Sequence, residues 1–228
     1  MKSQATLPRT LQALLIAGAC IFALARAQAA DPVQVTANNY VRAESDFQMR
    51  GYIENFDSFG KFYHSRKPYD VNNQVTVRGN RDTLYSFGVF DLTSPLTITL
   101  PDTKGRYQSL MVVNQDHSLA AAYSPTTVTL TEDKVGTRFA LLTIRTFMDP
   151  NDEKDMKAAH RLQDAVKVKQ ADIGKFEAPN WKQEEVEQMR ETINVVAATV
   201  TDSSKMFGRK EELDPVYWML GAALGWGG

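Results

Sequence analysis

The chain has 228 residues, of which 43% are hydrophobic, 23% are charged and 10% are aromatic, and its formal net charge is −1. These proportions are those of an ordinary globular protein and exclude collagen, coiled-coil and disordered classes. The near-zero charge gives no electrostatic reason to expect nucleic acid as a partner. A single cysteine cannot form an intramolecular disulfide, and a cysteine-ligated metal site would need several. The composition indicates no cofactor.

Residues 1–29 have the order of a secretory signal peptide. Lys2 and Arg9 form a basic start, an apolar run covers 11–24, and an A-x-A sequence ends at Ala29. The alternative is a membrane-spanning helix, but the run is too short to cross roughly 30 Å of hydrocarbon at about 1.5 Å per residue. The pattern favours a signal peptide that is cleaved.

A lipid anchor on Cys20 is a second alternative, because small residues precede that cysteine. The sequence stays apolar through Ala25, however, where a mature lipoprotein would turn polar. Cleavage after Ala29 would remove 29 of the 228 residues and leave 199, with no cysteine. It would also remove three basic residues and no acid, which moves the net charge from −1 to −4. We expect a periplasmic or secreted protein that is stabilised without disulfides and has no membrane attachment after cleavage.

The first element of the mature chain is predicted to be a helix from Thr36 to about Asn55. Thr36 suits a helix N-cap, and Tyr40, Ala43 and Phe47 recur at helical spacing. Residues 56–73 then turn to glycine, aromatic and polar types, which predicts a long ordered loop. A loop of this length is more often functional or buried than a simple connector.

Residues 75–146 are predicted to form strands. Short runs rich in β-branched and aromatic residues alternate with proline- and glycine-containing turns, and two of them alternate cleanly between apolar and polar positions. The spacing favours an antiparallel sandwich over a parallel sheet. The six expected strands are 75–77, 83–90, 96–100, 107–113, 127–131 and 139–146.

From Asp149 onward the apolar spacing becomes helical. Helices are predicted from Asp149 to about Gln170, from Lys182 to about Val200, and from Pro215 onward. The fold class is therefore α+β: an antiparallel β-sandwich core with an N-terminal helix and two or three C-terminal helices. We expect a single domain over residues 30–228.

The densest polar cluster lies where the second expected strand begins. It contains Asn80, Arg81, Asp82 and Tyr85, whose side chains can fix a carboxylate, a sugar or an amide by directed hydrogen bonds. The alternative is that Arg81 and Asp82 pair across the sandwich and only hold the loop. These four residues are candidates for substrate binding.

Three further candidates lie near other strand ends. Asp116 and His117 follow the strand 107–113, and Arg145 lies near the end of the strand 139–146. Asp82, Asp116 and His117 are the candidates for acid–base work, which needs a carboxylate or histidine with a shifted pKa. No short histidine spacing of a metal site is present, so none is predicted, although distant residues could assemble one. Ser86 lacks the G-x-S-x-G signature of a hydrolase nucleophile, and no phosphate-binding glycine loop is found.

Several of these motifs resemble an exported bacterial family called domain of unknown function 1254. The likeness is carried by N-R-D-T-L-Y at 80–85, G-R-Y-Q-S at 105–109, N-Q-D-H at 114–117 and G-W-G-G at 225–228. It extends over nearly all of the mature chain. The resemblance implies a β-sandwich with helical additions, usually followed by a second β domain called domain of unknown function 1214. It implies no activity and no catalytic residues.

Members of that family typically continue past the G-W-G-G motif, whereas this sequence stops at Gly228. The expectation is a single domain truncated before its second β domain. Tyr217, Trp218, Met219 and Leu220 would then form an exposed apolar patch for the missing domain or for a second copy of the chain. The alternative is that the last helix docks on the sandwich and the chain is complete.

Two functional hypotheses follow. In the first, the protein is an exported module that binds or acts on a small polar molecule at the strand ends, and the seven candidate residues converge in one pocket. In the second, it is a structural or assembly module without catalysis, and its apolar helices meet another domain or subunit.

Overall fold

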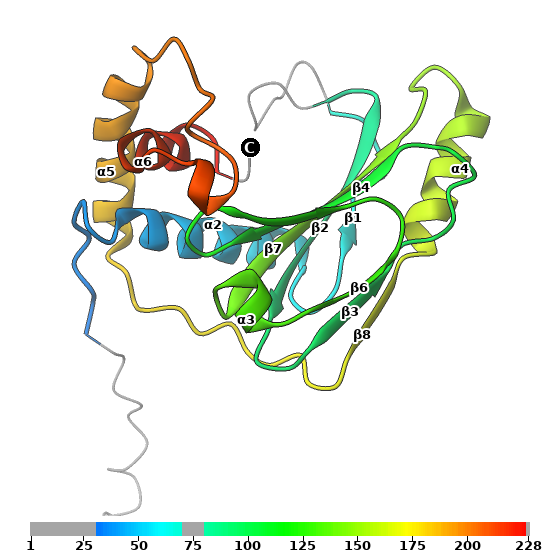
Figure 1. Ribbon diagram of the computed structural model, residues 1–228, viewed down its shortest axis with the longest axis horizontal. Coiled ribbons are helices and arrows are strands. Elements are labelled where there is room, and N and C mark those ends of the chain that lie inside the picture. The colour runs from blue at the N-terminus through cyan, green and yellow to red at the C-terminus, as the bar shows by residue number, and fades with distance from the viewer. Residues whose placement is uncertain (1–30, 70–79, 227–228) are drawn as a thin grey trace, which may run out of the picture. The chain divides into compact units, whose positions relative to one another are not determined.

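The computed structural model describes residues 31–69 and 80–226, and those from Val33 onward belong to one compact unit. Its centre is a pair of antiparallel sheets (Figure 1). The larger sheet has the strand order β1-β2-β7-β4-β5, with bounds Tyr63–His64, Thr83–Asp91, Phe139–Phe147, Gln108–Asn114 and Leu119–Tyr123. The smaller has the order β6-β3-β8, with bounds Thr127–Leu130, Leu96–Thr99 and Lys167–Gln170.

The two sheets enclose the main hydrophobic core. Alternate residues of the larger sheet, among them Phe90, Leu110 and Ile144, pack against Ile98 and Leu130 of the smaller sheet, and all five are almost fully buried. This alternation is what a sheet requires when one face meets a second sheet. The α+β class with a β-sandwich core is confirmed.

The other face of the larger sheet carries the helices, and we call it the helix-side face. Helix α2 (Tyr40–Phe56) covers part of this face, where Met49 packs against Phe87, Val89 and Phe139. Helices α5 (Gln183–Ala197) and α6 (Pro215–Leu224) pack against α2 at one end of the sheet (Figure 1). The N-terminal helix and the last two helices are thus confirmed.

Helix α4 (Glu153–Asp164) begins at an Asp152 cap and lies at the opposite end of the sheet from α5 and α6 (Figure 1). It packs on Leu84 of β2 through Ala159 and Met156. A short helix, α3 (Glu132–Val135), and a 3-10 turn at Lys210–Glu212 complete the helices of the described residues. None of the helices described is long and apolar enough to span a bilayer.

The prediction that one helix runs from Asp149 to about Gln170 is wrong in its second half. The helix ends at Asp164, and Lys167–Gln170 form β8 on the smaller sheet, where Val168 joins the sandwich core. Val168 alternates with exposed lysines, which suits a strand with one buried face, and its burial against β3 outweighs the good helix propensity of lysine and glutamine.

Two other strands were not predicted from the sequence. The expected loop 56–73 contains β1 within its described part, and Leu119–Tyr123 forms β5. The alanines of β5 lack the β-branched signal on which strand prediction depends. The expected strand 75–77 and the expected signal peptide at 1–29 lie outside the described residues.

Candidate functional site

The N-Q-D-H sequence forms the turn between β4 and β5. The Asn114 side chain organises it, because its Oδ1 accepts from the backbone N–H of Asp116 and of Ser118, both at 3.1 Å. Its Nδ2 donates to the carbonyl of Val135 at 3.0 Å. His117 has a φ of 52°, in the left-handed region that closes tight turns. The motif therefore has a clear structural task.

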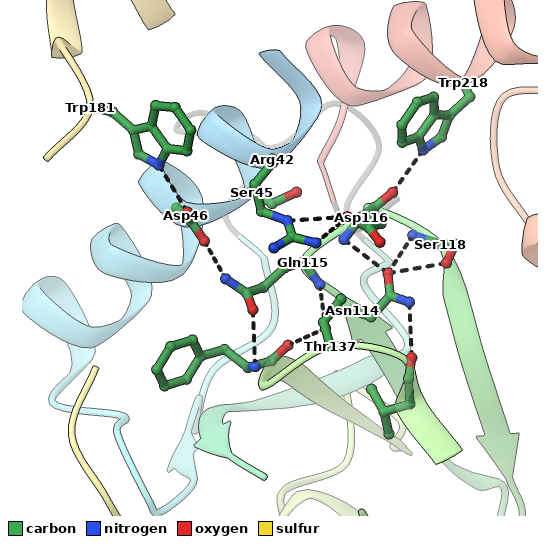
Figure 2. Close-up of polar contacts among 12 residues, drawn as sticks. Arg42, Ser45, Asp46, Asn114, Gln115, Asp116, Ser118, Thr137, Trp181 and Trp218 are labelled. Carbon is green, nitrogen blue, oxygen red and sulfur yellow. Dashed lines mark hydrogen bonds and ion pairs between the residues drawn. The ribbon is translucent and has the colours of Figure 1, made fainter. Parts of the chain in front are cut away.

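Gln115 ties this turn to helix α2. Its Nε2 donates to Oδ1 of Asp46 at 2.6 Å, and its Oε1 accepts from the N–H of Phe139 at 3.1 Å (Figure 2). The second oxygen of Asp46 accepts from the indole Nε1 of Trp181 at 2.8 Å. Burial raises the pKa of Asp46, and the hydrogen bonds from Trp181 and Gln115 oppose that shift. Helix, sheet and the segment before α5 are joined through one buried carboxylate.

Asp116 and His117 complete the joint. The Asp116 carboxylate forms an ion pair with Arg42 of α2, and its carbonyl accepts from Trp218 Nε1 of α6 at 2.8 Å (Figure 2). The His117 ring is 4% exposed and lies between Trp226, stacked at 5.8 Å, and Phe207, edge-on at 5.9 Å. Burial lowers the pKa of His117 to about 4, so the ring is neutral at pH 7. Through its contacts with Arg42 and Trp218, Asp116 connects the turn to α2 and α6.

A hollow of about 250 Å³ opens beside His117 on the helix-side face. Its walls are mostly apolar, and no lysine or arginine of the described residues lines it. The lining residues are Met111, Val113, His117, Ser118, Leu119, Phe207 and Gly208.

A second group of candidates forms a row across three strands. Arg145 of β7 is paired directly with Tyr85 of β2 on one side and with Ser109 of β4 on the other. The guanidinium carbon of Arg145 lies 5.5 Å from the centre of the Tyr85 ring, a cation–π contact. The Tyr85 hydroxyl accepts from the N–H of Asn80 at 3.3 Å, and the Tyr107 hydroxyl donates to Ser109 Oγ at 3.0 Å.

Aromatic side chains surround this row on the helix-side face. Tyr107 is 55% exposed and Phe147 is 42% exposed, unusual values for large apolar groups next to a sheet. Tyr107 is two residues before Ser109 and Phe147 is two residues after Arg145, so all four side chains lie on the same face of the sheet. We call Tyr85, Tyr107, Ser109, Arg145 and Phe147 the aromatic row. Within the described ranges, no carboxylate forms an ion pair with Arg145.

Asp82 lies in a different hollow, of about 350 Å³, where β2 begins. Three further aspartates and Phe147 of the aromatic row line it, and one of the aspartates, Asp155, is paired with Arg106. Arg81 is exposed to solvent. In the part of the chain that the structure describes, no three His, Cys, Asp or Glu side chains are arranged to hold a metal ion. Asp82 and Arg81 thus lie apart from the turn that contains His117.

The expectation that all seven candidates converge in one pocket is wrong. Asn80, Tyr85 and Arg145 come together, and Asp116 and His117 come together at the other end of the same strands. Along β4, Ser109 and Val113 are four residues apart, which corresponds to about 13 Å at roughly 3.3 Å per residue. In an antiparallel sheet the start of one strand lies beside the end of its neighbour. A residue near a strand start and one near a strand end can therefore lie together or far apart, and position in the chain alone does not distinguish the two cases.

Sequence analysis does not identify Tyr107, Ser109 and Phe147 of the aromatic row, or Met111 of β4. Ser109 and Met111 connect the aromatic row to the His117 hollow, and the strict alternation of side chains along a strand would have placed them with Val113. Ser86, which was considered as a nucleophile, is fully buried on the opposite face. Its Oγ lies 2.7 Å from His64 Nδ1 and 3.3 Å from Gln163 Nε2, so it belongs to the packing of α4.

Comparison with known proteins gives a family match and a fold match. Residues 59–132 match a family described as "Protein of unknown function (DUF1254)". No curated protein matches the chain. The crystal structure of the VPA0106 protein from Vibrio parahaemolyticus superposes with a TM-score of 0.58 at 14% identity, covering 84% of this chain and 67% of that one. This likeness shows the fold alone.

Proposed function

We propose that this protein is an exported binding module that holds a small organic carboxylate on the aromatic row. The observation that carries the proposal is Arg145, a half-buried guanidinium set against Tyr85 with no described carboxylate paired to it. A guanidinium offers a planar fork of donors that matches a carboxylate. The exposed rings of Tyr107 and Phe147 supply apolar contact for the rest of the ligand.

The polar groups beside Arg145 support a ligand with a defined orientation. Tyr85 and Ser109, which both have a hydroxyl, lie directly beside Arg145 on the two neighbouring strands. Each already has one hydrogen-bond partner, and a hydroxyl can both donate and accept. The aromatic row contains no histidine, cysteine or carboxylate, so binding is proposed here without catalysis.

The test is calorimetric titration with benzoate against benzamide, a neutral molecule of the same shape. We expect benzoate to bind and benzamide to bind at least tenfold more weakly, because hydrogen bonds to a charged group are worth about 1.5–3 kcal/mol. Arg145→Gln should remove this preference. Arg161→Gln, at an exposed arginine of α4, is the matched control and should retain it. Equal binding of acid and amide by the natural protein would refute the proposal.

Export is the second part of the proposal, and it is supported by the basic, apolar and small-residue order of residues 1–29. Expression of the full sequence in a bacterium, followed by N-terminal sequencing of the periplasmic fraction, tests it. We expect a new N-terminus at Ala30. Recovery of the protein only from the cytoplasm with Met1 intact would contradict export.

A structural or assembly module is the alternative function, and helix α6 favours it. Leu220, Ala222 and Ala223 are buried against the neighbouring helices, but Val216 is 58% exposed and Leu224 is 44% exposed. The expected patch is thus only partly formed, since Trp218 is engaged with Asp116. A second β domain or a second copy of the chain could cover Val216 and Leu224. Chromatography at rising concentration tests self-association: a dimer dispersed by Val216→Ser with Leu224→Ser would favour this alternative.

A further inference from the structure

The aromatic row and the His117 hollow lie on the same face of the same sheet. Arg145 is paired with Ser109, and the next two residues of β4 on that face are Met111 and Val113, both of which line the hollow. Met111 is only partly buried, and its partner on β5, Ala122, is exposed. A chain-like molecule placed along β4 would therefore contact Arg145 at one end and the hollow at the other.

The two ends of this path differ in chemistry. At the Arg145 end are a guanidinium and the hydroxyls of Tyr85, Tyr107 and Ser109. At the other end, four of the seven residues that line the hollow have apolar side chains: Met111, Val113, Leu119 and Phe207. Ser118 Oγ is occupied by a hydrogen bond to Asn114 Oδ1 at 3.1 Å. A ligand that matches both ends has one anionic head and one apolar tail.

We propose that the carboxylate ligand is an elongated, medium-chain aliphatic acid, bound with its head at Arg145 and its tail in the His117 hollow. This inference rests on the proposed function, because it assumes that Arg145 holds the carboxylate. To that function it adds the direction in which the ligand lies along β4, the length of the ligand and the apolar nature of its tail. The span from Ser109 to Val113 sets that length at about 13 Å, from roughly 3.3 Å per residue.

A dicarboxylate fits the same path less well. Its second charge would enter a hollow that no lysine or arginine of the described ranges lines, beside a histidine that is neutral at pH 7. Burying an unpaired carboxylate there would be strongly unfavourable. An apolar tail instead gains free energy with each methylene that leaves water.

The first test uses calorimetry with a series of straight-chain carboxylates from acetate to decanoate, each below its micelle-forming concentration. We expect the affinity to rise about fourfold per added methylene, as about 0.8 kcal/mol for each buried CH₂ implies, and then to reach a plateau when the hollow is filled. Leu119→Trp should bring the plateau to a shorter chain, and Leu119→Ala should move it to a longer one. Thermal unfolding confirms that each variant is folded.

The outcome of the series shows whether this inference alone fails or whether the proposed function fails with it. A chain-length series in which affinity does not rise, with benzoate still bound through Arg145, overturns this inference and leaves the proposed function standing. Failure of every carboxylate to bind overturns both. A rising series that Arg145→Gln leaves unchanged also overturns both, because the head would then lie elsewhere.

The second test uses the fluorescence of a tryptophan that lies beside the hollow. Trp226 stacks on His117 at 5.8 Å, so its fluorescence should be quenched by a bromine atom at the end of the tail. We expect ω-bromodecanoate to quench strongly and 2-bromodecanoate to quench weakly. Trp226→Phe is the control and should remove the difference. Equal quenching by both compounds would overturn the proposed direction of the ligand.

Discussion

The two ends of the helix-side face contain similar kinds of residues and use them differently. At the β4–β5 turn, hydrogen bonds of Asn114, Gln115 and Asp116 are formed with α2, with α6 and with the neighbouring backbone. At the other end, Arg145 rests on an aromatic ring without a described acidic partner. A polar cluster in a sequence therefore does not by itself indicate a binding site. The distinguishing property is whether the charges are already satisfied within the protein.

The largest loss of stability is expected from substitution of Gln115, at the turn end of the helix-side face. Gln115→Ala removes a donor to the buried Asp46 carboxylate and leaves the N–H of Phe139 without its acceptor. Each unsatisfied buried group costs about 1–3 kcal/mol, so we expect unfolding free energy to fall by roughly 3–4 kcal/mol in urea titrations. Gln188→Ala, at an exposed position of α5, is the control, and we expect it to change the unfolding free energy by no more than about 0.5 kcal/mol. A loss under about 1 kcal/mol at Gln115 would contradict the view of this turn as a joint.

The pH dependence of stability should also originate at the turn. The pKa of His117 is about 4 in the folded protein and about 6.5 when unfolded, so the unfolded chain binds more protons between these values. Its contribution is complete above pH 6.5 and is lost as the pH falls to 4, by at most about 3 kcal/mol. His64, whose pKa is also lowered by burial, acts in the same direction. Asp46 acts in the opposite direction, because its raised pKa favours the folded state as the pH falls.

His117→Asn tests this assignment, since asparagine also tolerates a positive φ. We expect the variant to be less stable at pH 7 and its unfolding free energy to change less between pH 7 and pH 4.5. Urea titrations at the two pH values measure this. An unchanged pH slope would show that His117 is not the group responsible.

Sequence analysis predicted most of the framework but not the site. The strands 83–90 and 139–146 and the three main helices followed from periodicity, because each buries one face and its apolar residues recur accordingly. The sequence indicates Arg145 and Tyr85 only as polar groups near strand ends. Their pairing with Ser109, and the separation from His117, depend on the register between strands distant in sequence, which no local pattern contains. The structural role of Gln115 likewise depends on Asp46, 69 residues away.

A smaller effect is expected where α6 meets the turn. Trp218→Phe keeps most of the apolar contact but removes the hydrogen bond from the indole Nε1 to the Asp116 carbonyl. We expect a loss of about 1 kcal/mol in unfolding free energy, the usual net value of one such bond. Tyr217→Phe, at a more exposed position of the same helix, is the control and should have almost no effect. Equal losses in the two variants would mean that the bond to the turn contributes little.

Among these substitutions, the smallest effect on stability should occur at Arg145. This substitution tests the difference between the two ends of the helix-side face most directly. Arg145→Gln removes a cation–π contact that is only partly shielded from water, worth about 0.5–1 kcal/mol, and breaks no described ion pair. Unfolding free energy should therefore fall by less than about 1 kcal/mol while carboxylate binding is lost. A residue that the fold can do without, yet whose charge is left available beside exposed aromatic rings, is what a binding role requires. A loss as large as that of Gln115→Ala would instead make Arg145 part of the framework, and the two ends of the face would no longer differ.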